Sequence, residues 1–83
     1  MDLQINLLSF DEALEISNVC ERYSKFFDID AVCGRYVVDA SSILGMESLV
    51  GNSVIINIHG KNRNQDKVNE LKTELIKIKN LYE

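Results

Sequence analysis

The spacing of hydrophobic residues changes along the chain, and the order of these changes limits the folds that the sequence can adopt. Residues 2–8 alternate between apolar and polar side chains, which is the pattern of a half-buried strand. Apolar residues then recur every three or four positions over residues 10–27, which predicts a helix with one core-facing side. Ser9 followed by Glu12 is typical of a capping box, so we expect the helix to begin there.

The middle of the chain predicts a hairpin and a short helix. Residues 29–33 and 36–39 are rich in β-branched side chains, and the Gly34-Arg35 pair between them suits a two-residue type II′ turn. Residues 42–49 are too short and too dense in Leu, Met and Ile for a surface strand. We therefore expect a short helix over this segment.

The last third of the chain returns first to a strand pattern and then to a helix pattern. Residues 53–59 alternate, and residues 68–82 keep a three-four apolar spacing with charged residues between. The element order is therefore βαββαβα. It predicts an α+β fold in which a four-stranded antiparallel sheet carries its helices on one face.

The composition fits a small globular domain, with 46% hydrophobic and 27% charged residues in 83 positions. We expect a single domain over residues 1–83. The net charge of −4 disfavours direct nucleic-acid binding, which depends on clustered Lys and Arg. No apolar run approaches the length of a membrane span and the N-terminus is not signal-like, so we expect a cytoplasmic protein without a membrane partner. In that compartment Cys20 and Cys33 are expected to be reduced.

The sequence offers little for catalysis. His59 stands late in a predicted strand, where we expect an exposed imidazole rather than a proton shuttle or a metal ligand. Asp11, Glu12 and Glu15 cluster at a helix start, where carboxylates stabilise the positive end of the helix dipole. Neither cysteine has a neighbouring base in sequence. We predict no catalytic residue, no metal site and no cofactor, and so a protein that is not an enzyme.

Ser42 precedes the short helix and can serve as its N-cap. Capping alone would explain a serine here. The same position would also accommodate a phosphoserine, because a helix start presents N–H groups to an anion. The added charge would change any partner surface formed by Ile43 and Leu44.

With these segments in place, the sequence resembles the HPr family, the small phosphocarrier proteins of the bacterial sugar phosphotransferase system. The similarity covers most of the chain and is carried by the stretches YSKF (23–26), GRYVVDA (34–40), SSILGMESL (41–49) and SVIINIHG (53–60). The third stretch looks like the family's regulatory K-S-I-[ML]-G-x-x-S-L segment, with Ser42 at the serine that HPr kinase phosphorylates and Ser41 in place of the usual lysine. The resemblance also implies an open-faced βαββαβα sandwich.

The sequence departs from the family at its phosphocarrier motif. Family members carry a phosphorylatable histidine in G-[ILV]-H-A-R-P at the start of the first helix. This chain has SFDEALE, which places Glu12, or a neighbour such as Asp11, at the histidine position and Leu14 at that of the arginine. Nearby carboxylates would repel a phosphoryl group. Glu47 puts a charge where the family's docking patch is usually apolar.

The resemblance and the departure together predict a regulatory or adaptor protein that is not an active histidine phosphocarrier. Its switch would be phosphorylation of Ser42, and its partner-binding residues would be Ile43, Leu44, Met46 and Glu47. The partners implied are HPr kinase or a catabolite-control transcription regulator. Two alternatives stay open: a phosphocarrier of the phosphotransferase system that uses an unorthodox residue, and a relative in fold alone that binds an unrelated protein.

Overall fold

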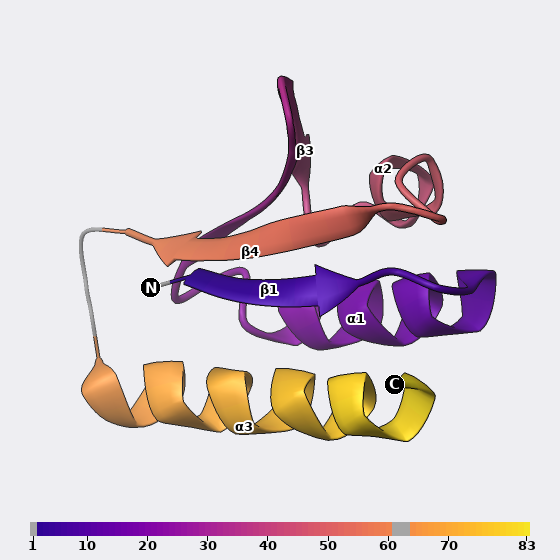
Figure 1. Ribbon diagram of the computed structural model, residues 1–83. Coiled ribbons are helices and arrows are strands. Elements are labelled where there is room, and N and C mark those ends of the chain that lie inside the picture. Colours follow the sequence, from indigo (N-terminus) through magenta and orange to yellow (C-terminus); the bar gives the residue numbers. More distant parts are fainter. Residues whose placement is uncertain (1, 61–63) are drawn as a thin grey trace.

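The computed structural model describes residues 2–60 and 64–83, and its elements follow the predicted order (Figure 1). They are β1 (Asp2–Asn6), α1 (Phe10–Arg22), β2 (Asp28–Cys33), β3 (Tyr36–Asp39), α2 (Ile43–Glu47), β4 (Ser53–His59) and α3 (Gln65–Tyr82). The four strands form one antiparallel sheet in the order β1-β4-β2-β3. The predicted α+β architecture is confirmed.

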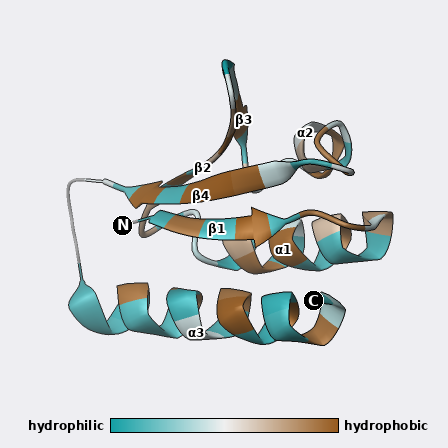
Figure 2. Ribbon diagram, in the orientation of Figure 1, coloured by the Kyte–Doolittle hydropathy of each residue, from teal (hydrophilic) through white to brown (hydrophobic). Residues whose placement is uncertain are grey.

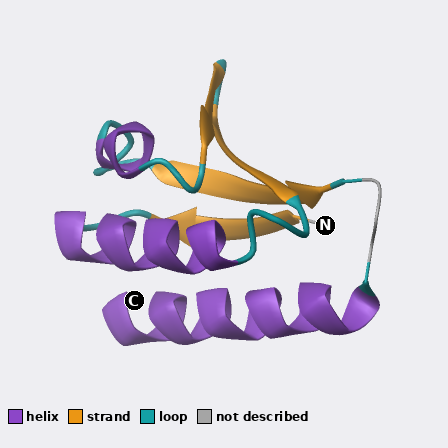
Figure 3. Ribbon diagram, turned by 180° about the vertical axis from the view of Figure 1, so that it is seen from behind, coloured by secondary structure: helices purple, strands orange, loops and turns teal. Residues whose placement is uncertain are grey.

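The core lies between the sheet and two helices that run side by side along one of its faces. These helices are α1 and α3, while α2 packs against α1 and β3 at one end of the sheet (Figures 1 and 3). Hydrophobic residues dominate the middle of β4, whereas they alternate with hydrophilic ones along β1 and around α3 (Figure 2). The largest fully buried apolar side chains come from β1 and the segment after it, from β4 and from all three helices, and include Ile5, Leu7, Ile16, Met46, Ile56, Leu71 and Leu75.

The first helix is shorter than predicted, although its apolar pattern continues. α1 ends at Arg22, where the sequence predicted residue 27. The Tyr23 N–H donates to the Cys20 carbonyl at 3.2 Å, and the N–H groups of Phe26 and Phe27 then both donate to the Tyr23 carbonyl. These bonds close tight turns in place of helix. Phe27 nevertheless reaches the core and is 4% exposed. The apolar spacing of the sequence therefore predicts the burial of Phe27 correctly, although this residue lies beyond the end of the helix.

The β2–β3 connection is the predicted two-residue hairpin. Cys33 pairs with Tyr36, which leaves Gly34 and Arg35 as the loop. Gly34 has a φ of +59° and no non-glycine residue in the described chain has a positive φ, which is the pattern of a type II′ turn. β4 occupies the predicted residues 53–59. No helix among the described residues is long and apolar enough to cross a bilayer.

Candidate functional site

The two adjacent serines before α2 lie in different surroundings. Ser41 is partly buried, and its O–H and N–H both donate to Oδ1 of Asp39, at 2.6 and 2.9 Å. Ser42 is exposed, and its Oγ accepts the Gly45 N–H at 3.2 Å, as predicted for an N-cap. Within the described residues the Ser42 hydroxyl proton has no acceptor. Of the two hydroxyl groups, Ser42 carries the one that is both exposed and without an acceptor for its proton within the described part of the chain.

α2 turns one apolar side chain to solvent and another into the core. Leu44 is 80% exposed and Ile43 is 38% exposed, whereas Met46 is fully buried. The prediction that Met46 belongs to a partner-binding surface is therefore wrong. The reason is geometric, because successive helical residues differ by about 100°, so that Leu44 and Met46 point in nearly opposite directions.

The exposed surface around α2 combines Ser42, Ile43, Leu44 and Glu47. Glu47 is half-buried and stands four residues after Ile43, on the same side of the helix. Glu47 thus adds a negative charge beside the apolar residues. We call these four residues the α2 surface.

Gly45 allows α2 to approach β3 closely. A Cβ at this position would lie 3.2 Å from Cβ of Val38 and 3.5 Å from the Ser42 side chain. A side chain would therefore push α2 away from the hairpin. The absence of a side chain at Gly45 thus permits the close packing of α2 on β3, and the Gly45 N–H donates the hydrogen bond that Ser42 Oγ accepts as N-cap.

Glu12, at the start of α1, is a buried carboxyl group. Ser9 Oγ accepts the Glu12 N–H at 3.2 Å, as in a capping box. In a capping box the glutamate accepts the N–H of the cap residue, here Ser9, but Glu12 Oε1 instead accepts the N–H of Leu8, one residue earlier, at 2.7 Å. Oε2 is buried and has no hydrogen-bond partner among the described residues. Burial raises the pKa of Glu12, as do the nearby carboxylates of Glu83 and Glu15, while the bond from Leu8 acts in the opposite direction.

The surroundings of the α1 start are acidic. The Tyr82 hydroxyl donates to the Glu15 carboxylate, and this bond raises the pKa of Tyr82 to about 12. Glu83 Oε1 accepts the N–H of Asn6 at 2.8 Å. Glu12 is thus an inaccessible carboxyl group among further acidic residues. This arrangement does not favour binding of a phosphoryl group.

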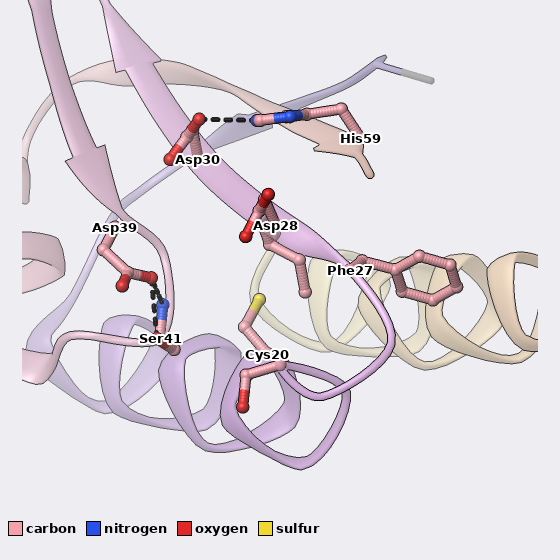
Figure 4. Close-up of a pocket in the computed structure, with 9 residues that line it drawn as sticks. Cys20, Phe27, Asp28, Asp30, Asp39, Ser41 and His59 are labelled. Carbon is pink, nitrogen blue, oxygen red and sulfur yellow. Dashed lines mark hydrogen bonds and ion pairs between the residues drawn. The ribbon is translucent and has the colours of Figure 1, made fainter. Parts of the chain in front are cut away.

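His59 has a partner that the sequence analysis missed. Its Nε2 lies 2.7 Å from Oδ2 of Asp30, and the two side chains are 43% and 35% exposed. The pair lies in a cleft of about 270 Å³ that is also lined by Asp28, Asp39, Ser41 and Cys20 (Figure 4). β2 and β4 are antiparallel neighbours in which Asp28 faces His59 and Asp30 faces Asn57, so the contact is diagonal. Only the strand register could have revealed it.

The cysteines and the acidic groups of the described residues show no arrangement suited to a metal ion, and the Cys20 thiol is not activated. Burial, and secondarily the Asp39 carboxylate, raise the pKa of the Cys20 thiol to about 12, so the thiol is protonated at neutral pH. Cys20 and Cys33 are both free thiols. Over residues 2–60 and 64–83, no group of three or more His, Cys, Asp and Glu side chains is arranged to hold a metal ion.

The fold is shared with solved structures of phosphocarrier proteins. HPr-C-His from Thermoanaerobacter tengcongensis superposes with a TM-score of 0.68 at 20% identity, over 96% of this chain and 91% of that one. The histidine-containing phosphocarrier protein from a Mycoplasma gives a TM-score of 0.69 at 9% identity, over 94% and 90%. This chain has an HPr-like fold. No protein-family model matches the sequence of this chain, and no curated protein matches it either.

Proposed function

We propose that this HPr-like protein is a regulatory adaptor of the phosphotransferase system, that phosphorylation of Ser42 switches its α2 surface, and that it is neither a histidine phosphocarrier nor an enzyme. The observation that carries the proposal is the exposed Ser42 hydroxyl beside Leu44, which is 80% exposed. The proposed partners are HPr kinase, which would modify Ser42, and a catabolite-control transcription regulator, which would dock on the modified surface. Both partners imply a cytoplasmic protein.

The chemistry at Ser42 supports the choice of this residue. A kinase needs a hydroxyl group that it can reach and deprotonate, and the Ser42 proton is not engaged within the described structure. The Ser41 hydroxyl would first have to break its hydrogen bond to Asp39. The first turn of α2 contains no acidic residue to repel a phosphate, and the Gly45 N–H already points at Ser42 Oγ. Phosphorylation would therefore be compatible with the fold.

Phosphorylation would change the character of the α2 surface. The phosphate adds a charge of about −1.5 to −2 beside Ile43 and Leu44. Together with Glu47, it would form an anionic border around two apolar side chains. A partner with arginine residues around an apolar pocket would then bind the modified form more tightly. The unmodified form would present the same apolar residues with only the Glu47 charge.

The α1 start supports the absence of histidine phosphotransfer. The sequence resemblance gives the position of the family histidine to Glu12 or to a neighbour such as Asp11, and both are carboxylic acids. Glu12 is fully buried, and its Oε1 accepts a hydrogen bond from the Leu8 N–H. A phosphoryl donor could not reach this carboxyl group without opening the start of α1. The neighbouring Glu15 and Glu83 carboxylates add repulsion.

A competing function is phosphate transfer through an unorthodox residue, and one observation favours His59 for that role. Its ring is partly exposed and oriented by Asp30, as nucleophilic imidazoles are in many enzymes. However, the cleft that holds His59 also contains Asp28 and Asp39, and their negative charge opposes an incoming phosphoryl donor. We therefore rank this function second.

The proposal is tested by incubating the protein with HPr kinase and ATP and measuring its intact mass. We expect one phosphate on the wild type and on Ser41→Ala, and none on Ser42→Ala. Ser41→Ala is the matched control, because it removes the adjacent hydroxyl and leaves the α2 cap in place. Modification of Ser42→Ala to the wild-type level would refute Ser42 as the switch. If Ser42 is modified but Ser42→Asp captures the same partners as the wild type, the protein shares only the HPr fold and binds by another route.

A further inference from the structure

The sheet has two edges, β1 and β3, and within the described residues side chains bond to the outward backbone groups of β1. At the β1 edge, Lys79 Nζ donates to the Gln4 carbonyl at 2.9 Å, and Glu83 Oε1 accepts the Asn6 N–H at 2.8 Å. Lys79 lies in the last turn of α3, and Glu83 directly follows the helix. They occupy backbone groups that another strand would otherwise use. This is a familiar way for proteins to block pairing at a sheet edge.

The β3 edge lacks such protection at its centre. In a two-residue hairpin the residues flanking the loop, here Cys33 and Tyr36, exchange hydrogen bonds with each other. The next residue, Val37, therefore directs its N–H and C=O away from β2. Within the described residues no side chain meets these two groups. The Asp39 carbonyl, further along the edge, accepts the Ser42 N–H at 3.0 Å.

The side chains of β3 also favour pairing. Tyr36 is 72% exposed and Val37 is 62% exposed. Residues 36–39 contain neither proline nor lysine, which commonly protect edge strands. The end of the β2–β3 hairpin projects away from α1 and α3, and both views leave its edge open (Figures 1 and 3).

We propose that a second copy of this chain pairs with β3 in the antiparallel direction, about a two-fold axis through Val37. In this register the two Val37 residues exchange their free N–H and C=O groups. Arg35 of each copy then faces Asp39 of the other. Because the two-fold axis repeats every contact, the charges complement each other at both ends of the paired strands.

A row of apolar side chains crosses the face of the sheet that α1 and α3 do not cover, and in the dimer this row would continue across the two-fold axis into the second copy. The strand register places Ile55 opposite Val32, and Val32 opposite Val37. The row thus reaches the uncovered edge, and the second copy would extend it across a sheet of twice the width. β3 has only four residues, so we expect a weak association that depends on protein concentration.

The test is sedimentation equilibrium of the full chain over a series of protein concentrations. The wild type is compared with variants in which the charge of Arg35 or Asp39 is reversed. We expect the wild type to pass from monomer to dimer. Arg35→Asp and Asp39→Arg each create two like-charge contacts, so each variant alone should self-associate at least about tenfold more weakly. An equimolar mixture of the two variants restores both opposite-charge contacts and should dimerise again.

A backbone variant keeps the test independent of the Asp39 contacts to Ser41. Val37→Pro removes the outward N–H without breaking a bond of the β2–β3 ladder, so the monomer should fold while the dimer is lost. Ile55→Thr is the matched control on the same face, two strands from the axis, and should dimerise as the wild type does. A wild type that stays monomeric at every concentration would overturn the proposal, and so would dimerisation of folded Val37→Pro at wild-type strength.

Discussion

Alanine substitutions at Met46 and Leu44 test which side of α2 faces the core. Met46 is fully buried, so Met46→Ala removes a large side chain from the core and leaves a cavity. Such changes cost about 2–5 kcal/mol. An 83-residue domain has a free energy of unfolding of roughly 4–12 kcal/mol. The substitution should therefore remove a large part of the stability and lower the Tm by about 10 °C or more.

Leu44→Ala should have almost no effect on stability, because this side chain is 80% exposed. We expect a change within about 0.5 kcal/mol. The assay is urea unfolding followed by circular dichroism, with the slope m unchanged and only the midpoint shifted. Met46→Leu is the control for volume and should cost less than about 1.5 kcal/mol. Equal losses for the two alanine variants, or a larger loss for Leu44→Ala, would refute the described orientation of α2.

Three further predictions concern caps and titrating groups. Ser42→Ala should lower the free energy of unfolding by about 1 kcal/mol, because it removes the N-cap of α2, whereas Ser42→Asp should stay within about 0.3 kcal/mol of the wild type. Equal losses for the two variants in urea unfolding would contradict the capping role. The hydrogen bond to Glu74 raises the pKa of Tyr23 to about 12, so Glu74→Gln should move its tyrosinate absorbance transition to lower pH. The pKa of Glu12 is raised above 4.5, so the stability that this group contributes is full below its unfolded pKa and falls as the pH rises through its folded pKa. Glu12→Gln should remove this fall from the pH dependence of the urea midpoint, and an unchanged profile would contradict the burial of the carboxyl group.

The sequence predicted those parts of the fold in which a repeating pattern is long enough to define a period. β4 has the predicted bounds because seven alternating residues specify both its length and its inward face. The β2–β3 turn was predictable because only a glycine suits the positive φ at residue 34. The end of α1 could not be predicted in this way. Tyr23, Phe26 and Phe27 keep the helical spacing of apolar residues, although the backbone has already left the helix and forms tight turns.

Features that depend on a short element or on distant contacts could not be predicted. α2 has five residues, fewer than two turns, so no repeat indicates that Met46 points inward while Leu44 points outward. The bond between His59 and Asp30 depends on the register of β2 against β4. The burial of Glu12 depends on how Leu8 enters α1 and on the acidic end of α3. The N-cap role of Ser42 is local, and it was predicted correctly.

The most direct test of the regulatory proposal compares two phosphate donors on the same protein. One sample receives HPr kinase and ATP, and the other receives phosphoenolpyruvate and the first enzyme of the phosphotransferase system. Peptide mapping by mass spectrometry then locates the phosphate. We predict acid-stable phosphate on Ser42 in the first sample and none in the second. Acid-labile phosphate on His59 in the second sample, with Ser42 unmodified in the first, would contradict the account and identify a phosphocarrier.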